Sequence, residues 1–329
     1  MSTATSTGVQ PEKILKELAG LWAGMSKDES SQGTNSGVLR ACSMTLVVAA
    51  ESDQDAIEAS GMLAELMHEH PSRAVVLRPS AEPGAMEARV FAQCWMPFGK
   101  RQQICCEQIE ITASRDRLDE VPGAILGIMV PDLPVVLWAR GKEWLSAPEF
   151  QLVLPLVQKL IIDSAKLGDP ARAFSLMRTL RSETTYVGDL AWTRLTALRQ
   201  AIAHLMEDAA LLPRLHLVEQ IAVEFGDHPI SGTYLAAWLH KGLPRAKVSL
   251  RHRTDAASSV RLIGPGLDVG MELGPSLIIR VDGVEHRAVL PVPGECDLMR
   301  EELSILEADP VFASVFESAE ELAKGGPRE

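Results

Sequence analysis

Two aspartates stand where a carboxylate could act as an acid, a base or a binding group. Asp132 lies between Pro131 and Pro134 at the mouth of an apolar run, and Asp189 precedes a helical pattern. Loops at strand ends in α/β proteins often carry function, which makes Asp132 a candidate. The structural alternative for Asp132 is that it only forms a turn. For Asp189, the alternative is that it caps the helix N-terminus, a contact worth about 1 kcal/mol.

Trp192, Arg194 and Arg199 share the helix predicted after Asp189. Trp192 and Arg199 are seven residues apart, which places them roughly on one helix face. Tryptophan and arginine are typical anchors of protein interfaces, so these residues could form a partner-facing patch. The alternative is a tryptophan at the edge of the core beside a solvated arginine, and the sequence favours neither.

The sequence contains no familiar nucleotide-binding or hydrolase motif. It has no GxxxxGK(S/T) phosphate loop and no GxSxG nucleophile elbow. Gly264, Gly266 and Gly270 are one residue off the dinucleotide fingerprint, and they do not lead from a buried strand into a helix. We therefore interpret this segment as a loop and predict no cofactor.

Histidines and cysteines show no pattern of a metal or redox site. His68 and His70 are two residues apart, so they do not share a helix face, and no further ligands accompany them. Cys105 and Cys106 are adjacent in a predicted strand and point to opposite faces, which favours ordinary packing. The five cysteines include no CxxC pair, which predicts free thiols in a reducing cytoplasm.

The composition is that of a large acidic globular protein. The 329 residues predict about two domains, and the 46% hydrophobic content suffices for an extensive core. A net charge of −12 argues against nucleic acid or an anionic membrane as the main partner. The first residues lack the basic and apolar regions of a signal peptide. Prolines interrupt the apolar stretch 121–139, which predicts a helix, a turn and a strand rather than a membrane span.

Residues 1–37 are predicted to be a flexible tail with one short helix, Ile14–Trp22, and residues 38–168 an N-terminal α/β domain. Its central strand is predicted at Pro131–Gly141, whose unbroken apolar run is too short for a core helix. A strand–helix–strand unit and a hairpin predict a three-layer domain with a mixed sheet. The other predicted elements are strands 42–50, 74–77, 88–98, 103–113 and 160–164, and helices between Ser52 and Pro71, over 118–130 and over 150–159.

Gly168-Asp169-Pro170 is a strong turn signal, and we place the domain boundary there. Residues 169–329 are predicted to form a C-terminal α+β domain with an antiparallel sheet. Asp282-Gly283 signals a hairpin, and Asp309 followed by proline signals a helix start. The remaining predicted elements are helices over 171–181, from Asp189 through Leu205 and from Ser231 to Lys241, and strands 215–225, 246–251, 260–263, 276–281 and 286–290.

Three segments in this order resemble one protein family. They are His70-Pro71-Ser72-Arg73, the run from Pro131 to Trp138, and the run from Gly188 to Leu195. Their order and spacing are similar to those of the OpcA family, which is described as an assembly protein or subunit of glucose-6-phosphate dehydrogenase. The resemblance covers about residues 38–323.

The resemblance implies a non-catalytic cytoplasmic protein that promotes the active oligomer of the dehydrogenase in the oxidative pentose phosphate pathway. It implies no catalytic residues, and the residues of the three segments become candidates for partner binding: His70, Arg73, Asp132, Trp138, Asp189, Trp192, Arg194 and Arg199. The competing hypothesis is an enzyme or sensor that binds a sugar phosphate in the α/β domain. Its candidate residues are Arg40, Arg73, Arg78 and Asp132, which a pocket would have to bring together.

Overall fold

The computed structural model describes residues 5–31, 39–96, 103–253, 258–274 and 276–325. The chain falls into two compact units that alternate along the sequence. Unit 1 comprises Met1–Ile162, Arg181–Gly188 and Met299–Glu307, and unit 2 comprises Asp163–Leu180, Asp189–Leu298 and Ala308–Glu329. The domain boundary that we place between residues 168 and 169 stays a prediction.

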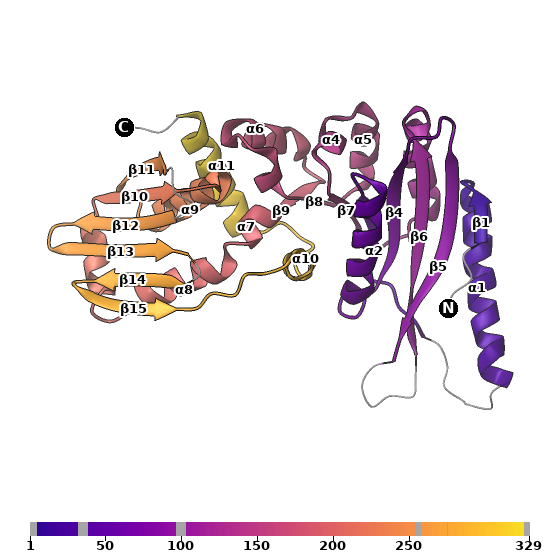
Figure 1. The fold of residues 1–329 in the computed structure, drawn as a ribbon, viewed down its shortest axis with the longest axis horizontal. Helices are drawn as coiled ribbons and strands as arrows, with labels where there is room; N and C mark the ends of the chain where they lie inside the picture. The colour runs from indigo at the N-terminus through magenta and orange to yellow at the C-terminus, as the bar shows by residue number, and fades with distance from the viewer. Residues whose placement is uncertain (1–4, 32–38, 97–102, 254–257, 275, 326–329) are drawn as a thin grey trace. The chain divides into compact units, whose positions relative to one another are not determined.

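Unit 1 is built on a mixed sheet with the strand order β1-β5-β6-β4-β3-β7-β8-β9, and β2 pairs with β6 (Figure 1). Strands β4, β3, β7 and β8 run parallel to their neighbours, and β5 runs antiparallel to β6. The strands are β1 (Thr5–Gly8), β2 (Leu39–Arg40), β3 (Met44–Ala49), β4 (Ser72–Ser80), β5 (Met86–Trp95), β6 (Ile104–Ser114), β7 (Val135–Ala139), β8 (Lys159–Ile162) and β9 (Tyr186–Asp189).

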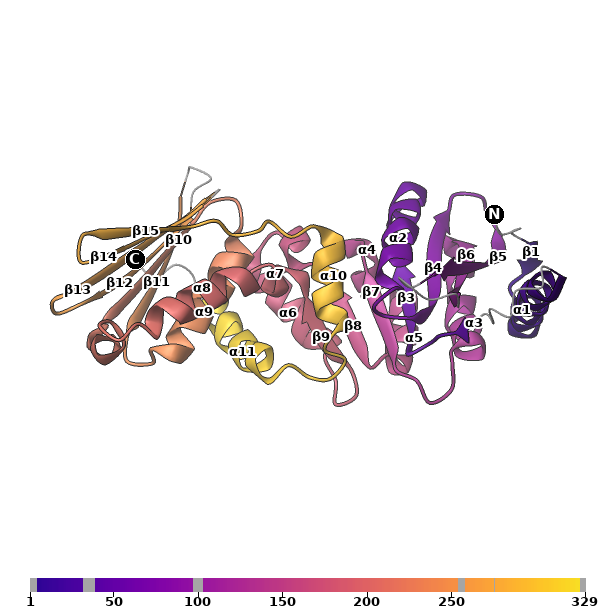
Figure 2. The ribbon, with the colours of Figure 1, turned by 90° about the horizontal axis from the view of Figure 1, so that it is seen from below.

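Helices cover both faces of this sheet, as Figure 2 shows for α2 on one face and α3 and α5 on the other. The crossovers β3-α2-β4 and β6-α3-β7 move in opposite directions along the sheet, and right-handed connections then place their helices on opposite faces. The α/β class is thereby confirmed. The helical elements are α1 (Pro11–Ser31), α2 (Asp53–Leu66), η1 (Arg115–Glu120), α3 (Val121–Ile128), α4 (Lys142–Ser146), α5 (Pro148–Val153) and η2 (Leu154–Leu156).

The predicted central strand is confirmed as β7, which lies between β3 and β8 and is buried along its whole length. It is shorter than predicted because residues 131–134 form a turn, in which Asp132 has a φ of 63°. The helix after Ser52 is also confirmed. Ser52 accepts a hydrogen bond from the amide of Asp55, which is the predicted N-cap contact.

The N-terminal region differs from the predicted flexible tail. Residues Thr5–Gly8 pair with β5, and the helix spans Pro11–Ser31 instead of only Ile14–Trp22. Ile14 and Leu18 are fully buried, because the apolar stripe of α1 packs on β5 and α3. The apolar stripe in the sequence predicted that a helix forms here, but the packing of α1 on β5 and α3 determines how long the helix is. Residues 32–37 of the predicted linker lie outside the described residues.

Two further predictions for unit 1 concern the β5–β6 hairpin and the helix after Phe150. The hairpin of β5 and β6 is confirmed, and its predicted turn at Gly99 and Lys100 lies outside the described residues. The helix predicted over 150–159 is wrong at its end, since the helical segment ends at Leu156 and Lys159 begins β8. Helix α4 was not predicted.

Unit 2 contains a second sheet with the order β11-β10-β12-β13-β14-β15. The predicted antiparallel pairing is confirmed from β10 through β15, but β11 runs parallel to β10. This difference follows from α9, which connects the two strands as a crossover. The strands are β10 (Gln220–Phe225), β11 (Lys247–His252), β12 (Ser258–Gly264), β13 (Leu267–Leu273), β14 (Leu277–Val281) and β15 (Val284–Ala288).

The interpretation of the Gly264–Gly270 segment as a loop is wrong. Gly266, with a φ of 67°, forms a tight turn between β12 and β13, and Gly270 lies within β13 opposite Arg261. The Asp282-Gly283 hairpin is confirmed, and both residues have the positive φ that such a turn requires.

The remaining helical elements are η3 (Ser164–Leu167), α6 (Pro170–Leu180), α7 (Leu190–Thr193), α8 (Thr196–Met206), η4 (Leu212–Leu217), α9 (Pro229–Gly242), α10 (Glu295–Leu303) and α11 (Pro310–Lys324). Helix α9 packs on β10 and β11, and α11 packs on α9 and α6. The division between the units falls within α10, after Leu298. The cap at Asp309 is confirmed by hydrogen bonds from the amides of Val311 and Phe312.

Three boundaries predicted in this region are wrong. The helix predicted after Asp189 is broken into α7 and α8, because the amide of Leu195 bonds to the carbonyl of Trp192 instead of continuing the helical ladder. Helix α9 begins at Pro229, so Ser231 lies inside it and does not cap it. The strand predicted from Leu215 begins only at Gln220, after the short helix η4.

Candidate functional site

The carboxyl ends of β3, β4, β6 and β7 meet at one edge of the sheet in unit 1, where parallel α/β sheets commonly bind ligands. A small hollow of about 160 Å³ lies there, lined by Glu51, Ser80, Arg115 and Trp144 among others. Backbone closes part of this edge. A Cβ on Gly141 would lie 2.9 Å from the Cβ of Glu51, so the two chain segments are already in close contact.

Two arginines at this edge, Arg78 and Arg140, are engaged in ion pairs within the chain. Arg140 pairs with Asp55 at 2.7 Å, and Arg78 pairs with Asp53 and with Glu110. The first turn of α2 is capped from within, since Ser52 accepts from the amide of Asp55. The carboxylates around this helix start would repel a phosphate, which the amides of a dinucleotide site attract. The start of α2 therefore does not offer a phosphate the free amides of a dinucleotide site.

The residues of the sugar-phosphate hypothesis do not converge. Arg78 lies toward the carboxyl end of β4 with Asp53, whereas Arg73 lies near its start. Asp132 precedes the amino end of β7 in an exposed turn, at the same edge of the sheet as Arg73 and away from Arg78. Arg78 is thus separated from the other three residues, and Arg40 and Arg73 are paired with Glu107.

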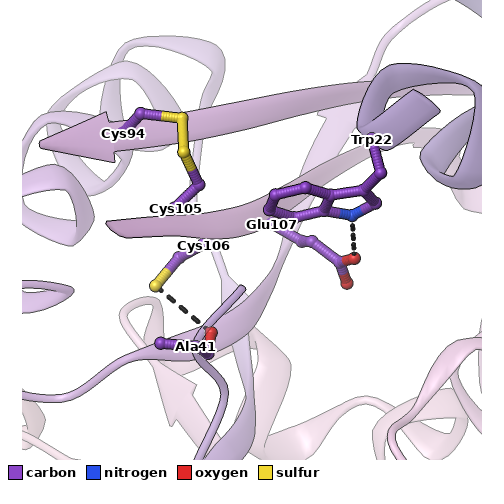
Figure 3. The surroundings of a disulfide bond; sticks show 6 residues. All are labelled: Trp22, Ala41, Cys94, Cys105, Cys106 and Glu107. Carbon is purple, nitrogen blue, oxygen red and sulfur yellow. Dashed lines mark hydrogen bonds between the residues drawn. A yellow bond between two sulfur atoms is a disulfide. The ribbon is translucent and has the colours of Figure 1, made fainter. Parts of the chain in front are cut away.

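Arg73 and Arg40 instead share one buried carboxylate, Glu107. Arg73 donates from Nε to Glu107 at 2.6 Å, and Nη2 of Arg40 lies 2.8 Å from the same group. Trp22 of α1 donates its indole N–H to Glu107 at 2.7 Å (Figure 3). Glu107 and Arg73 are 3% and 5% exposed, so this network holds α1, β2, β4 and β6 together.

Asp189 is the centre of a second buried network, which lies in unit 2. Its Oδ1 accepts from the amides of Ser164 and Ala191, both at 3.0 Å. Its Oδ2 accepts from the hydroxyls of Ser164, at 2.5 Å, and Tyr234, at 2.7 Å. Burial raises the pKa of Asp189 from 3.8 to about 6, although the hydrogen bonds from Ser164, Tyr234 and Ala191 act to lower it. Asp189 is thus confirmed as the predicted N-cap of α7, and the same carboxyl group has a raised pKa.

Trp192 and Arg199 are brought together as the heptad spacing predicted. The guanidinium carbon of Arg199 lies 3.6 Å from the centre of the Trp192 ring. The ring itself is 4% exposed and packs against Tyr234 and Phe312, at centroid distances of 5.7 and 5.9 Å. Arg194 is half-buried and pairs with Asp163 at 3.0 Å. Four candidates, Asp189, Trp192, Arg194 and Arg199, thus share the segment from β9 to α8.

The other candidates lie in unit 1. His70 places Nε2 3.1 Å from the carbonyl oxygen of Arg300. Trp138 is 1% exposed and lies under the guanidinium of Arg140 at 4.5 Å. These contacts make both residues part of the framework of the unit.

Sequence reasoning missed a buried lysine in unit 1. Lys159 is 3% exposed, and its ammonium group bonds to the Glu302 carboxylate at 2.8 Å and to the carbonyls of Glu302 and Ile305. Gly188 leaves the room for this pair, since a Cβ there would collide with Glu302 Oε1. The glycine of the Gly188–Leu195 segment was the only signal, and it could not reveal a partner more than 100 residues away.

The prediction of free thiols is wrong for two cysteines. Cys94 on β5 and Cys105 on β6 are register partners and form a disulfide with an S–S distance of 2.01 Å (Figure 3). A signal was present, because the two cysteines lie symmetrically about the predicted turn at Gly99 and Lys100. Cys106 faces the other way and remains a buried thiol, and desolvation raises its pKa to about 11.

Two other kinds of site find no support in the described residues. Across the described ranges, no three histidine, cysteine, aspartate or glutamate side chains are grouped in a way that could hold a metal ion. No helix in those same ranges has the length and apolar character required to span a bilayer.

Fold and site together define a two-unit α/β protein whose buried charged groups serve mainly its own framework. Two family descriptions match the chain in succession. Residues 63–179 match the N-terminal domain, and residues 185–316 the C-terminal domain, of what both descriptions call the "Glucose-6-phosphate dehydrogenase subunit". The chain belongs to this family, the OpcA family.

Curated relatives carry the same name. The chain is 27% identical over 208 residues to a "Putative OxPP cycle protein OpcA" of Synechocystis, a match that covers 60% of this chain and 42% of the relative. It is 26% identical over 231 residues to the protein of that name from Synechococcus elongatus, covering 65% of this chain and 52% of the relative. The chain spans about half the length of the curated relatives it matches.

Solved structures show a partial likeness of fold. Biliverdin reductase from Synechocystis has a TM-score of 0.48 at 10% identity, covering 87% of this chain and 98% of that one. The WlbA dehydrogenase from Thermus thermophilus has a TM-score of 0.46 at 11% identity, covering 87% and 96%. These values carry no information on the chemistry of this chain.

Proposed function

We propose that this protein is a non-catalytic partner of glucose-6-phosphate dehydrogenase that favours the active oligomer of that enzyme. The observation that carries the proposal is the succession of the two family domains along the chain. The relatives named as oxidative pentose phosphate cycle proteins support the same pathway. The proposal places the protein in the cytoplasm with the dehydrogenase.

The geometry of unit 1 supports a role without catalysis. Its sheet has the edge at which α/β enzymes bind phosphates, but Asp53 and Asp55 pair with two arginines there, Arg78 and Arg140. Glu51 adds a third carboxylate beside the start of α2. A bound sugar phosphate or dinucleotide would have to break these ion pairs. Its phosphate would then lie beside the negatively charged carboxylates, which repel it.

The mechanism we propose is linkage between binding and oligomerisation. A protein that binds the active dehydrogenase oligomer more tightly than the less active form shifts the population toward the active form. A tenfold shift requires a difference of about 1.4 kcal/mol in binding free energy. No covalent step is needed.

The half-buried arginines Arg194 and Arg199 are the partner-contacting residues we favour within the candidate set. The guanidinium of Arg199 stacks on the ring of Trp192, and the guanidinium of Arg194 pairs with Asp163. Both contacts fix the orientation of the arginine side chains. Trp138, Asp189 and Arg73 are buried, so their proposed contribution is to keep the framework that presents the surface. His70 and Asp132 stay candidates on unit 1.

The test is a titration of glucose-6-phosphate dehydrogenase from the same organism with this protein, with activity and native mass measured on the same samples. We expect a saturable rise in activity together with a mixed complex. If the protein binds both dehydrogenase forms equally, or changes neither rate nor mass, the proposal is wrong. Binding of glucose 6-phosphate by this protein alone would instead favour a metabolite-binding role.

A further inference from the structure

Strand β11 is the last strand on one side of the sheet in unit 2. Its inner edge is occupied, since the amide of Lys247 bonds to the carbonyl of Glu219 and that of Arg253 bonds to Phe225. Backbone groups alternate in direction along a strand, so the N–H groups of Val248, Leu250 and His252 point to the outer side. In the part of the chain that the structure describes, no strand pairs with that outer side.

The helices of unit 2 extend beyond β11. On β10, Ile221 and Val223 are fully buried under them, whereas their register partners Val248 and Leu250 are only half-buried. A groove of about 770 Å³ runs along β11 at this point. Its walls come from both layers, and the helical side is lined by His240 of α9, by Ser318, Glu321 and Leu322 of α11 and by Gly325, which follows α11.

The helical layer is thus wide enough to cover one more strand than the sheet contains. A strand added beside β11 would accept hydrogen bonds from the outward amides and would place every second side chain over the half-buried Val248, Leu250 and Leu322. This is the geometry by which proteins bind an extended peptide at a sheet edge, where the backbone supplies affinity and the groove supplies side-chain pockets.

The charge of the strand indicates the kind of peptide. Lys247, Arg251 and His252 are exposed along β11, which carries no acidic residue, although the chain has a net charge of −12. A second copy of β11 would bring like charges together, which is unfavourable. An acidic segment would be attracted to the same edge.

We propose that the outer edge of β11 binds an extended acidic segment of another polypeptide by strand addition. This inference is independent of the proposed function, because it concerns a surface whose occupant can be tested without the dehydrogenase.

The test uses a blocked hexapeptide of alternating glutamate and valine, added to the full-length protein while backbone amide exchange is followed by NMR. At saturating peptide we expect exchange at Val248, Leu250 and His252 to slow at least about tenfold. Exchange at Ser249 and Arg251, whose amides face β10, should change little. This alternation distinguishes strand addition from binding through side chains alone.

Two variants test the charge and the backbone separately, and a third serves as a control. The double variant Lys247→Glu/Arg251→Glu should bind the acidic peptide at least about tenfold more weakly. Arg287→Glu, an equally exposed change on the opposite edge strand β15, should leave binding unchanged. Val248→Pro removes one outward N–H without touching the bonds to β10 and should also weaken binding.

Three results would overturn the proposal. One is the absence of slowing, or slowing that is uniform along β11. Another is equal binding of a hexapeptide with lysine in place of glutamate. The third is slow exchange at the three outward amides without peptide, which would mean that the chain covers this edge itself. Deletion of residues 326–329 would show whether that cover is the C-terminus.

Discussion

The hydroxyl of Tyr234 donates a hydrogen bond of 2.7 Å to Oδ2 of Asp189, and both side chains are completely buried. Asp189 has a pKa of about 6 in the folded protein against 3.8 for a free side chain. The folded state therefore binds a proton that the unfolded state releases between these values. Its stabilising effect is fully present below about pH 4 and is lost as the pH rises through about 6.

Replacement of Asp189 by asparagine should remove this pH dependence. Asparagine keeps an acceptor for the amides of Ser164 and Ala191 and supplies a donor toward Tyr234. We expect the stability of the wild type relative to Asp189→Asn to fall by up to about 3 kcal/mol between about pH 4 and 6. Urea unfolding of both proteins across this range measures it. A parallel pH dependence in the two proteins would contradict the assignment.

Loss of Glu107 should strongly destabilise unit 1. Glu107→Ala leaves Arg73 buried without its carboxylate, and removing one partner of a buried pair costs about 3–5 kcal/mol. The matched control is Glu120→Ala, which removes the partner of Arg117 in an exposed ion pair and should cost far less stability. Denaturant unfolding compares the two. Equal losses would mean that the Glu107 network is not structurally important.

Reduction of the Cys94–Cys105 disulfide should destabilise the β5–β6 hairpin. The bond joins residues 11 apart, and opening a loop of that size restores unfolded-state entropy worth up to about 3 kcal/mol. Unfolding with and without a thiol reductant tests this, because the double variant Cys94→Ser/Cys105→Ser should not respond to the reductant. A reductant effect that persists in this variant would have to come from another cysteine.

Arg194→Glu should weaken binding to the dehydrogenase by about tenfold or more, the effect expected when a charged interface contact is reversed. Arg199→Ala should have a smaller effect in the same direction. Arg287→Glu on β15 serves as the control for an exposed charge reversal on the same unit. Affinity from the activity titration provides the measurement. Normal binding by both variants would remove the α7–α8 segment from the candidate interface.

Local sequence signals predicted much of the fold. The Ser52 cap, the Asp309 cap, the Asp282-Gly283 turn and the buried strand β7 each depend on a few neighbouring residues, and all are confirmed. The errors occur where tertiary packing decides. Examples are the length of α1 and the break between α7 and α8, because neither has a marker in its own sequence.

The site was less predictable for the same reason. Asp189 was identified from its capping position, but its partners Ser164 and Tyr234 lie 25 and 45 residues away in the chain. Glu107 and Lys159 are buried charged residues within strands, and a sequence cannot show which distant charge neutralises them. The Cys94–Cys105 pair was within reach, because symmetry about a predicted hairpin turn is a local property.

The alternation of the chain between the two units limits how this protein can be divided. A cut after residue 162 would deprive unit 1 of Arg181–Gly188 and of Met299–Glu307, and the second of these segments supplies the carboxylate of Glu302 that neutralises the buried Lys159. Residues 1–162 alone would then not be a self-sufficient module, and residues 163–329 would carry two segments of unit 1 without the rest of it. Recombination during evolution would have to move the two units together, and fragment-based experiments would have to use the full chain.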